Sequence, residues 1–207
     1  MNKILNCFKS YDIRGRVGEE INESLCYDIA LAFSQVINAK SVVVGYDARK
    51  TSPSFAQSFI NGILASGSDV INIGLCGTEE VYWATTEFIA CGGIMITGSH
   101  NPVEYNGIKI VKKGSQPLDF ETEYLEIKRI VQNNVAKPKS KKAGREHNKI
   151  KEARQAYISK ILSFLEVDNL LPLRVFVNCG NGAVGPTFFA LEERLQEMNS
   201  PLSFFKI

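Results

Sequence analysis

The fold of this chain is decided by the stretch Gly93-Ile94-Met95-Ile96, which runs directly into Thr97-Gly98-Ser99-His100-Asn101-Pro102. A second apolar stretch, Ile108-Lys109-Ile110-Val111, follows a few residues later. This pattern predicts a strand, a tight polar loop and another strand, with Ser99 where the first strand has just ended. In open α/β sheets, ligands bind in the crevice outside the carboxyl ends of the strands. The sequence therefore predicts a serine hydroxyl at a binding edge of a sheet.

Other groups able to take part in chemistry accompany Ser99. His100 follows it directly, and the ammonium group of Lys109 belongs to the next predicted strand. An imidazole at this position also suits a purely structural role, as a hydrogen-bond partner of the loop backbone. A glycine-punctuated loop near the amino terminus supplies Tyr11 and Arg14, and such a loop is also typical of an ordinary surface turn.

Around this loop, apolar runs typical of buried strands alternate with helices that have one apolar face. Strands are expected at residues 41–45, 70–73 and 93–96, and helices at residues 22–37, 51–67 and 78–88. Alternation of this kind is typical of βαβ units. We therefore expect a three-layer α/β/α domain whose mixed sheet is mostly parallel, followed by the start of a second α/β domain.

A change in composition marks the boundary between the two. Residues 137–145 are polar and basic and contain proline and glycine, as in a solvated linker. We place a first domain at residues 1–135, a linker at 136–148 and a second domain at 149–207. The second domain offers only two expected strands, and a two-stranded sheet rarely forms an independent domain. We therefore expect the second domain to be incomplete.

Composition excludes several classes of protein. Of the 207 residues, 44% are hydrophobic and 22% charged, which is typical of soluble globular proteins. The net charge of +2 gives no reason to expect nucleic acid or an acidic membrane as a partner. No apolar run approaches the roughly 20 residues of a membrane span, and the first residues do not resemble a signal peptide. The five cysteines include no C-x-x-C pair. These features predict a cytoplasmic protein without structural zinc or disulfides.

Several short motifs occur together and in a fixed order. The segment T-G-S-H-N-P followed by Y-N-G-I-K resembles the phosphoserine loop of the α-D-phosphohexomutases, the phosphomannomutase/phosphoglucomutase superfamily. Other motifs are similar to segments of the same family: Tyr-Asp-Ile-Arg-Gly (11–15), Gly-Tyr-Asp-Ala-Arg (45–49), Gly-Thr-Glu-Glu (77–80) and the glycine-rich segment 178–185. The third of these resembles the bacterial phosphomannomutase branch. The ordered set, which extends over nearly all of the chain, is far more specific than any single motif.

The resemblance implies a four-domain enzyme, of which these residues hold the first domain and the front of the second. In this family the serine aligned with Ser99 carries a transferable phosphoryl group, and a hexose 1,6-bisphosphate is the intermediate and activator. The family also binds Mg²⁺ through an aspartate-rich loop and the phosphoserine, so Ser99 is the candidate metal ligand here. The aspartate loop, the sugar-binding loop and the site for the substrate's own phosphate have no counterpart, so we expect the chain alone to be inactive.

The resemblance also implies roles for the side chains near Ser99. Lys109 is expected to steady phosphoryl oxygens or to carry a proton, and Arg14 to steady the same oxygens. Tyr11 is expected to position Arg14 or the sugar, and His100 to donate a hydrogen bond to the phosphoserine. The expected substrate is a hexose phosphate, with mannose 6-phosphate and mannose 1-phosphate interconverted.

Other functions fit parts of the same pattern. A phosphoglucomutase or a phosphoglucosamine mutase would use the same serine loop with a different sugar. A non-catalytic sugar-phosphate-binding module would keep the loop and bind its ligand without phosphoryl exchange. A serine hydrolase is disfavoured because Ser99 lacks the G-x-S-x-G turn. The sequence does not indicate the identity of the hexose or the oligomeric state.

Overall fold

Helices and strands alternate in the computed structural model, which describes residues 5–134 and 142–207. The elements, in chain order, are β1 (Ile13–Arg16), α1 (Glu23–Val36), β2 (Ser41–Tyr46), α2 (Ser52–Ala65), β3 (Asp69–Leu75), α3 (Thr78–Glu87), β4 (Gly92–Ile96), β5 (Tyr105–Lys112), β6 (Gln116–Pro117), α4 (Leu125–Gln132), β7 (Glu146–Asn148), α5 (Ile150–Leu162), β8 (Arg174–Val177), α6 (Gly185–Glu197) and β9 (Ser203–Lys206). The strands and helices expected on either side of the serine loop are confirmed.

The larger sheet has seven strands, in the order β1-β5-β4-β2-β3-β7, with β6 paired to β5. Strands β4, β2, β3 and β7 are parallel, whereas β5 runs antiparallel to both of its neighbours, β4 and β1. The predicted mixed, mostly parallel sheet is therefore confirmed. Because β2 and β4 are adjacent and parallel, their carboxyl ends meet at one edge of the sheet, where the loops after Tyr46 and Ile96 come together.

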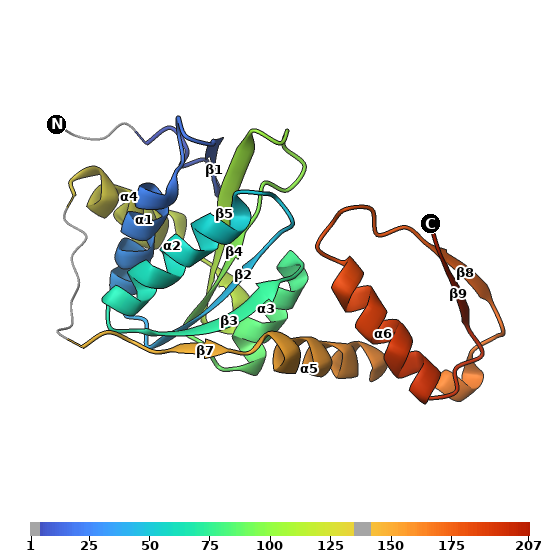
Figure 1. Cartoon of the computed structure of the whole chain (residues 1–207). Coiled ribbons are helices and arrows are strands. Elements are labelled where there is room, and N and C mark those ends of the chain that lie inside the picture. Colours follow the sequence, from blue (N-terminus) through green and yellow to red (C-terminus); the bar gives the residue numbers. More distant parts are fainter. Residues whose placement is uncertain (1–4, 135–141) are drawn as a thin grey trace.

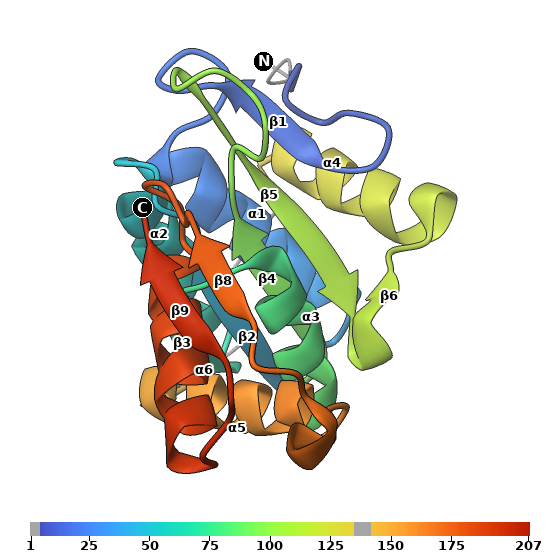
Figure 2. The same cartoon turned by 90° about the vertical axis from the view of Figure 1, so that its right-hand side faces the viewer.

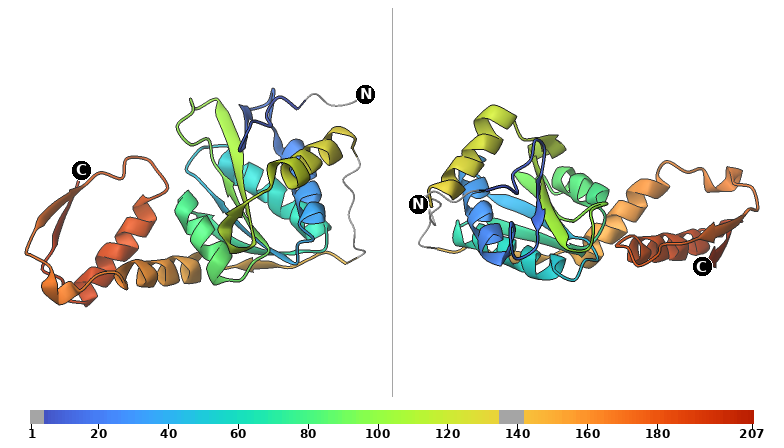
Figure 3. Two further views of the ribbon diagram at one scale, coloured as in Figure 1. Left: turned by 180° about the vertical axis from the view of Figure 1, so that it is seen from behind. Right: turned by 90° about the horizontal axis from the view of Figure 1, so that it is seen from above.

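Helices cover both faces of this sheet. Figures 1 and 3 show α1, α2 and α4 on one face and α3 and α5 on the other. Strand β2 is buried between them: Val42 and Val44 belong to the core beneath α1 and α2, and Val43 to the core beneath α3. Burial on both faces explains why this strand is an unbroken β-branched run rather than an alternating one.

Strand β1 was not expected, because its sequence, Ile-Arg-Gly-Arg, is short and polar. It nevertheless pairs with β5, which places Ile13 opposite Ile108 and Arg14 opposite Gly107. Ile13 and Ile108 are both fully buried. One apolar side chain and a ladder of backbone hydrogen bonds are enough to hold this segment at the sheet edge.

The predicted linker, residues 136–148, falls partly outside the described residues. Its last residues form β7, which extends the sheet by pairing with β3. The side chain of Asn72 on β3 donates a hydrogen bond to Glu146, with Nδ2 and Oε1 2.8 Å apart. All three β7 side chains are exposed, so this part of the segment is an edge strand held by backbone pairing and by side-chain bonds at the surface.

The carboxyl-terminal elements form a smaller unit beside α3. Strands β8 and β9 pair in parallel, and α5 and α6 pack beneath them around Ile158, Leu162 and Leu195. Figure 2 shows the outer face of β8 and β9 toward the viewer, and Phe176 and Phe205 stack on each other there, 60% and 39% exposed. Among the described residues, no helix combines the length and apolar character needed to cross a bilayer.

Candidate functional site

Ser99 lies in the loop that leaves the carboxyl end of β4. Thr97 and Gly98 are buried, whereas Ser99 is exposed and lines a cavity of about 1250 Å³. Its backbone adopts φ +51°, a left-handed conformation that residues other than glycine adopt rarely. The predicted serine at the sheet edge therefore borders open space. Its backbone conformation has to be maintained by the residues around it.

The cavity is walled by several elements that meet at this edge. They are the carboxyl end of β1, the loop after β2, the amino-terminal end of α3, the serine loop and residues 181–184 of the smaller unit. The charged side chains on its walls are Arg16, Glu19, Asp47, Arg49, Lys50 and Glu104. Cys76 also lines it, and burial raises the pKa of this thiol. Because a thiol rather than a thiolate results at neutral pH, Cys76 does not compete with Ser99 as a nucleophile.

Arg49, in the loop after β2, holds the serine loop by its backbone. Its Nη1 donates to the carbonyl oxygens of Pro102 at 2.7 Å and Tyr105 at 3.0 Å. Its Nη2 donates to the carbonyl oxygens of Ser99 at 3.1 Å and Asn101 at 2.5 Å. One guanidinium thus connects both sides of the loop that carries the serine.

Asp47 completes this connection from the same loop. Its Oδ2 accepts a hydrogen bond from the backbone N–H of Gly98 at 3.1 Å and lies 3.6 Å from Nε of Arg49. Its Oδ1 accepts from the Arg49 backbone N–H and from the Ser52 hydroxyl. The Ser52 hydroxyl also accepts a hydrogen bond from the buried side chain of Asn106. The loops after β2 and β4 are therefore bonded into one unit.

Arg14 and Lys109 are brought together, but through a carboxylate. Asp12 Oδ2 lies 2.6 Å from Nη2 of Arg14 and 3.5 Å from Nζ of Lys109. Arg14 is only 8% exposed, and its buried Nη1 has no hydrogen-bond partner among the described residues. Neither cation is among the residues that line the Ser99 cavity. The structure thus unites these two predicted residues on neighbouring strands without placing them against the serine.

Tyr11 and His100 also lie outside the cavity lining. Tyr11 is 97% exposed and borders a separate hollow of about 260 Å³ beside Asp12 and Tyr124. His100 is exposed, directly after Ser99. Their predicted contacts with Arg14, a sugar or a phosphoserine stay predictions.

The described residues do not complete a magnesium site. No group of three or more His, Cys, Asp or Glu side chains among them could hold a metal ion. The carboxylate bonded into the serine loop, that of Asp47, is engaged with Gly98, Arg49 and Ser52. Mg²⁺ requires several oxygen ligands, and of the predicted set only the oxygen of Ser99 is present.

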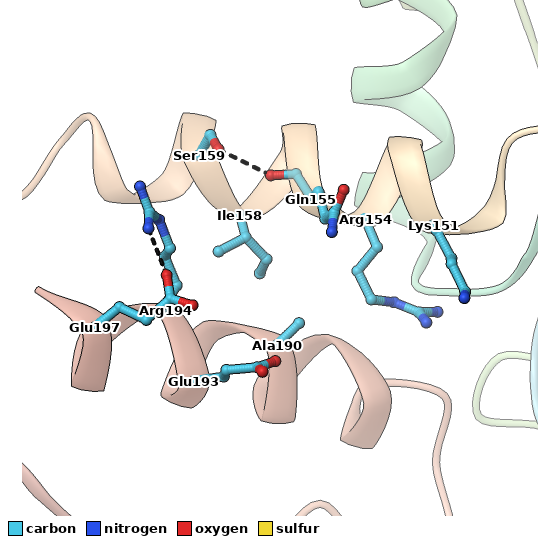
Figure 4. A pocket seen from close by; sticks show the side chains of 9 residues that line it. All are labelled: Lys151, Arg154, Gln155, Ile158, Ser159, Ala190, Glu193, Arg194 and Glu197. Atoms are coloured by element: carbon cyan, nitrogen blue, oxygen red, sulfur yellow. Dashed lines mark hydrogen bonds and ion pairs between the residues drawn. The ribbon is translucent and has the colours of Figure 1, made fainter.

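A further hollow, of about 470 Å³, lies between α5 and α6 and is drawn in Figure 4. Arg194 at one end pairs with Glu197, and Arg154 at the other donates to the carbonyl oxygen of Leu75 at 2.6 Å. The Ser159 hydroxyl donates to a backbone carbonyl of its own helix. None of the predicted site residues lines it. This hollow is a polar groove between two packed helices.

Sequence reasoning missed the roles of Asp47 and Arg49. Both were visible as polar residues directly after a buried strand, which is where a sheet presents its binding edge. The missing information was the strand order. Only when β2 is known to lie beside β4 does the loop after β2 become a neighbour of Ser99.

Comparison with known proteins gives a consistent picture. The family model described as "Phosphoglucomutase/phosphomannomutase, alpha/beta/alpha domain I" matches residues 5–137. The phosphomannomutase of Salmonella typhimurium strain LT2 is 41% identical over 203 residues, which are 98% of this chain and 44% of that protein. The phosphomannomutase of Escherichia coli K12 is 38% identical over 205 residues, 99% of this chain and 45% of that protein.

A solved structure supports the fold. The crystal structure of a phosphoglucomutase/phosphomannomutase family protein from Burkholderia thailandensis superimposes with a TM-score of 0.81 at 24% identity. The match covers 99% of this chain and 44% of that one. The chain thus spans less than half the length of the curated relatives that it matches.

Proposed function

Because this chain belongs to the phosphoglucomutase/phosphomannomutase family, we propose that it is the phosphoserine-bearing amino-terminal part of a phosphomannomutase, with Ser99 as the phosphoryl carrier. The observation that carries the proposal is the position of Ser99, exposed at the carboxyl end of β4 in a cavity of about 1250 Å³. A cavity of that size accommodates a hexose phosphate. The same family relationship underlies the proposal of a cytoplasmic isomerase.

In the proposed reaction, phosphorylated Ser99 gives its phosphoryl group to a free hydroxyl of a hexose monophosphate. The bond between Ser99 Oγ and phosphorus breaks and a bond between the sugar oxygen and phosphorus forms. The proton of the sugar hydroxyl is taken by a base and returned to Ser99 Oγ, which becomes a hydroxyl again. The resulting hexose 1,6-bisphosphate reorients and returns its other phosphoryl group to Ser99. Transfer of this kind depends chiefly on positioning and on charge stabilisation.

Arg14 and Lys109 are proposed to stabilise the transferred group. They lie on β1 and β5, and β5 is the direct neighbour of the strand that delivers Ser99. Neither side chain lines the Ser99 cavity in this structure, so in the proposed reaction both have to turn toward the serine when substrate binds. A phosphorylated Ser99 would also offer an oxygen to Mg²⁺, and the family resemblance assigns the other ligands to an aspartate-rich loop.

The choice of mannose rests on the relatives, which carry the name phosphomannomutase. Phosphoglucomutase and phosphoglucosamine mutase are the competing activities. We propose in addition that these 207 residues alone are inactive, because they correspond to less than half the length of the phosphomannomutases that they resemble. Rates with mannose 1-phosphate, glucose 1-phosphate and glucosamine 1-phosphate, measured on the full-length gene product, would rank the three sugars.

The decisive experiment is phosphorylation of the full-length gene product by glucose 1,6-bisphosphate, followed by peptide mass spectrometry. The expected result is one phosphoryl group on Ser99 and loss of mutase activity in Ser99→Ala. Ser163→Ala, on an exposed serine at the end of α5, is the matched control. Unchanged activity in Ser99→Ala would overturn the proposal. Binding of hexose phosphate without phosphoryl exchange would identify a non-catalytic module instead.

A further inference from the structure

Arg49 lines the Ser99 cavity but directs its hydrogen bonds away from it. An arginine beside a phosphorylatable serine is ordinarily interpreted as a phosphate ligand, because its fork of donors suits phosphate oxygens. Here the four N–H groups on Nη1 and Nη2 are matched by four backbone carbonyl oxygens, those of Ser99, Asn101, Pro102 and Tyr105. The donors that would bind a phosphate are therefore already engaged.

The guanidinium is also fixed by close packing. A Cβ atom added at Gly98 would lie 2.0 Å from Nε of Arg49 and 2.2 Å from Cζ, so the arginine occupies the space that a side chain would need. Asp47 holds the other side, 3.6 Å from Nε, and accepts from the Gly98 N–H. The Arg49 side chain is only 17% exposed. Its position is thus determined by contacts on several sides.

These contacts act directly on the backbone of Ser99. The Ser99 N–H donates to Oγ1 of Thr97 at 2.8 Å, and the Ser99 carbonyl accepts from Nη2 of Arg49. Both polar backbone groups of the residue are therefore bonded while it adopts φ +51°. Without such bonds a serine would leave this conformation readily, and the direction of its hydroxyl would change with it.

We propose that Arg49 is a positioning residue for phosphoryl transfer at Ser99, which acts through the loop backbone and not as a phosphate ligand. The inference rests on the proposed function and adds to it the residue that orients the Ser99 hydroxyl. Lysine cannot replace it, since one ammonium nitrogen with three donors does not span four carbonyls on two sides of a loop.

The test is a kinetic comparison of Arg49→Ala and Arg49→Lys in the full-length gene product, with mannose 1-phosphate as substrate and glucose 1,6-bisphosphate as activator. We expect kcat to fall about 100-fold in both, the scale of a misplacement of about 1 Å at a reacting group. The KM for mannose 1-phosphate and the pH profile should stay unchanged, and added guanidinium ion should restore part of kcat in Arg49→Ala. Arg129→Ala, on an exposed arginine paired with Glu126, is the matched control.

Gly98→Ala is an independent variant, useful if Arg49→Ala fails to fold. It keeps the arginine but displaces its guanidinium, so it should reproduce the loss of kcat. In Arg49→Ala, Arg49→Lys and Gly98→Ala, hydrogen exchange should become faster in residues 97–107 and stay unchanged in α1 and α2. A raised KM with normal kcat would overturn the inference by making Arg49 a substrate ligand, and so would wild-type kcat in Arg49→Ala. If Ser99→Ala is inactive in the same assay, the proposed function stands independently of that result.

Discussion

At the scale of single residues, the Asp12 carboxylate balances the positive charges of two side chains. Its carboxylate contacts both Arg14 and Lys109, and Arg14 is almost wholly buried. Removing the partner of a buried charge costs more than the pair itself contributes, because the remaining charge stays without solvation. Asp12 is therefore a residue on which stability and the electrostatics of the site both depend.

We expect Asp12→Asn to lower the free energy of unfolding by about 2 kcal/mol, the scale of a hydrogen bond to a charged group. Urea denaturation at neutral pH measures this change. Asp168→Asn, on an exposed aspartate of the smaller unit, is the control and should have no effect. A second readout is Tyr82, whose pKa is raised by burial and further by the charge of Asp12. In Asp12→Asn the Tyr82 pKa should fall and yet stay above its ordinary value; an unchanged value would contradict the assignment.

Cys7 predicts how stability depends on alkaline pH. Burial raises the pKa of its thiol to about 11, so the folded state favours the neutral form. The associated stability is complete below the pKa of an unfolded thiol, about 8.5, and is lost as the pH rises from there through 11. The expected loss is about 3 kcal/mol, because each unit of pKa difference corresponds to about 1.4 kcal/mol.

Urea denaturation of wild type and Cys7→Ala from about pH 8 to about pH 11, the range between the two pKa values, isolates the Cys7 contribution. The comparison is needed because the other buried thiols, Cys26 and Cys76, also have raised pKa values. Cys7→Ala should be less stable near pH 8, because it leaves a cavity, and its stability should fall less steeply as the pH rises. Cys179→Ala, on a partly exposed cysteine, is the control. Equal slopes in wild type and Cys7→Ala would show that the thiol does not contribute.

At the level of single residues, the sequence predicted the position of Ser99 but not the side chains that hold the serine loop and the nearby cations in place. Ser99 could be placed because the end of a strand is visible in a single local pattern. The pairing of Asp12 with Arg14 and Lys109 depends on β1 lying against β5, and the bonding of Arg49 to the serine loop depends on β2 lying beside β4. Such contacts join residues distant in sequence, and local periodicity contains no record of them.

At the scale of elements, the strand that delivers Ser99 depends on how closely α3 packs on it. A Cβ atom at Gly93 of β4 would lie 2.0 Å from the hydroxyl oxygen of Thr85 and 3.2 Å from side-chain atoms of Val81, both on α3. Thr85 is fully buried and donates to the carbonyl oxygen of Val81. The glycine therefore permits a helix-to-sheet approach that no larger residue allows.

We expect Gly93→Ala to destabilise the protein by about 2 kcal/mol through overpacking. The measurement is urea denaturation of the two single variants and the double variant Gly93→Ala/Thr85→Ala. Because Thr85→Ala removes the nearest clashing atom, the double variant should lose less than the sum of the two single losses. Strict additivity would mean that the two side chains do not meet.

The elements that the sequence failed to indicate share a physical cause. Strands β1 and β7 lie at the two ends of the sheet, where one side of the backbone has no partner strand in the larger sheet. Such strands need few apolar side chains: β7 is wholly exposed, and Ile13 is the one apolar side chain of β1. Hydrophobic periodicity, the main signal for strands, is absent from both. The apolar signal was strongest in β2, an unbroken β-branched run that is buried on both faces.

At the scale of the whole molecule, the smaller unit contributes a wall to the Ser99 cavity. Residues 181–184, just before α6, line it opposite the domain that carries the serine. One buried hydrogen bond ties α6 to that domain: the Thr187 hydroxyl donates to Oε1 of Glu80 at 2.8 Å. The same oxygen accepts from the backbone N–H of Gly77 at the start of α3. Glu80 thus links the beginnings of two helices at the edge of the cavity.

This link yields a prediction about how the two units are held together. Thr187→Val keeps the shape of the side chain and removes the hydroxyl. Of the donors to buried Glu80 in the described part of the chain, the Gly77 N–H then remains. We expect a loss of about 1 to 3 kcal/mol, the cost of a buried acceptor deprived of a partner. Hydrogen exchange should accelerate in residues 178–187 before it changes in β4, because α6, which packs on α5, has then lost its hydrogen bond to Glu80 of α3. Thr187→Ser restores the hydroxyl and should recover the protection; if it does not, packing of the threonine methyl group and not the hydrogen bond fixes this wall of the cavity.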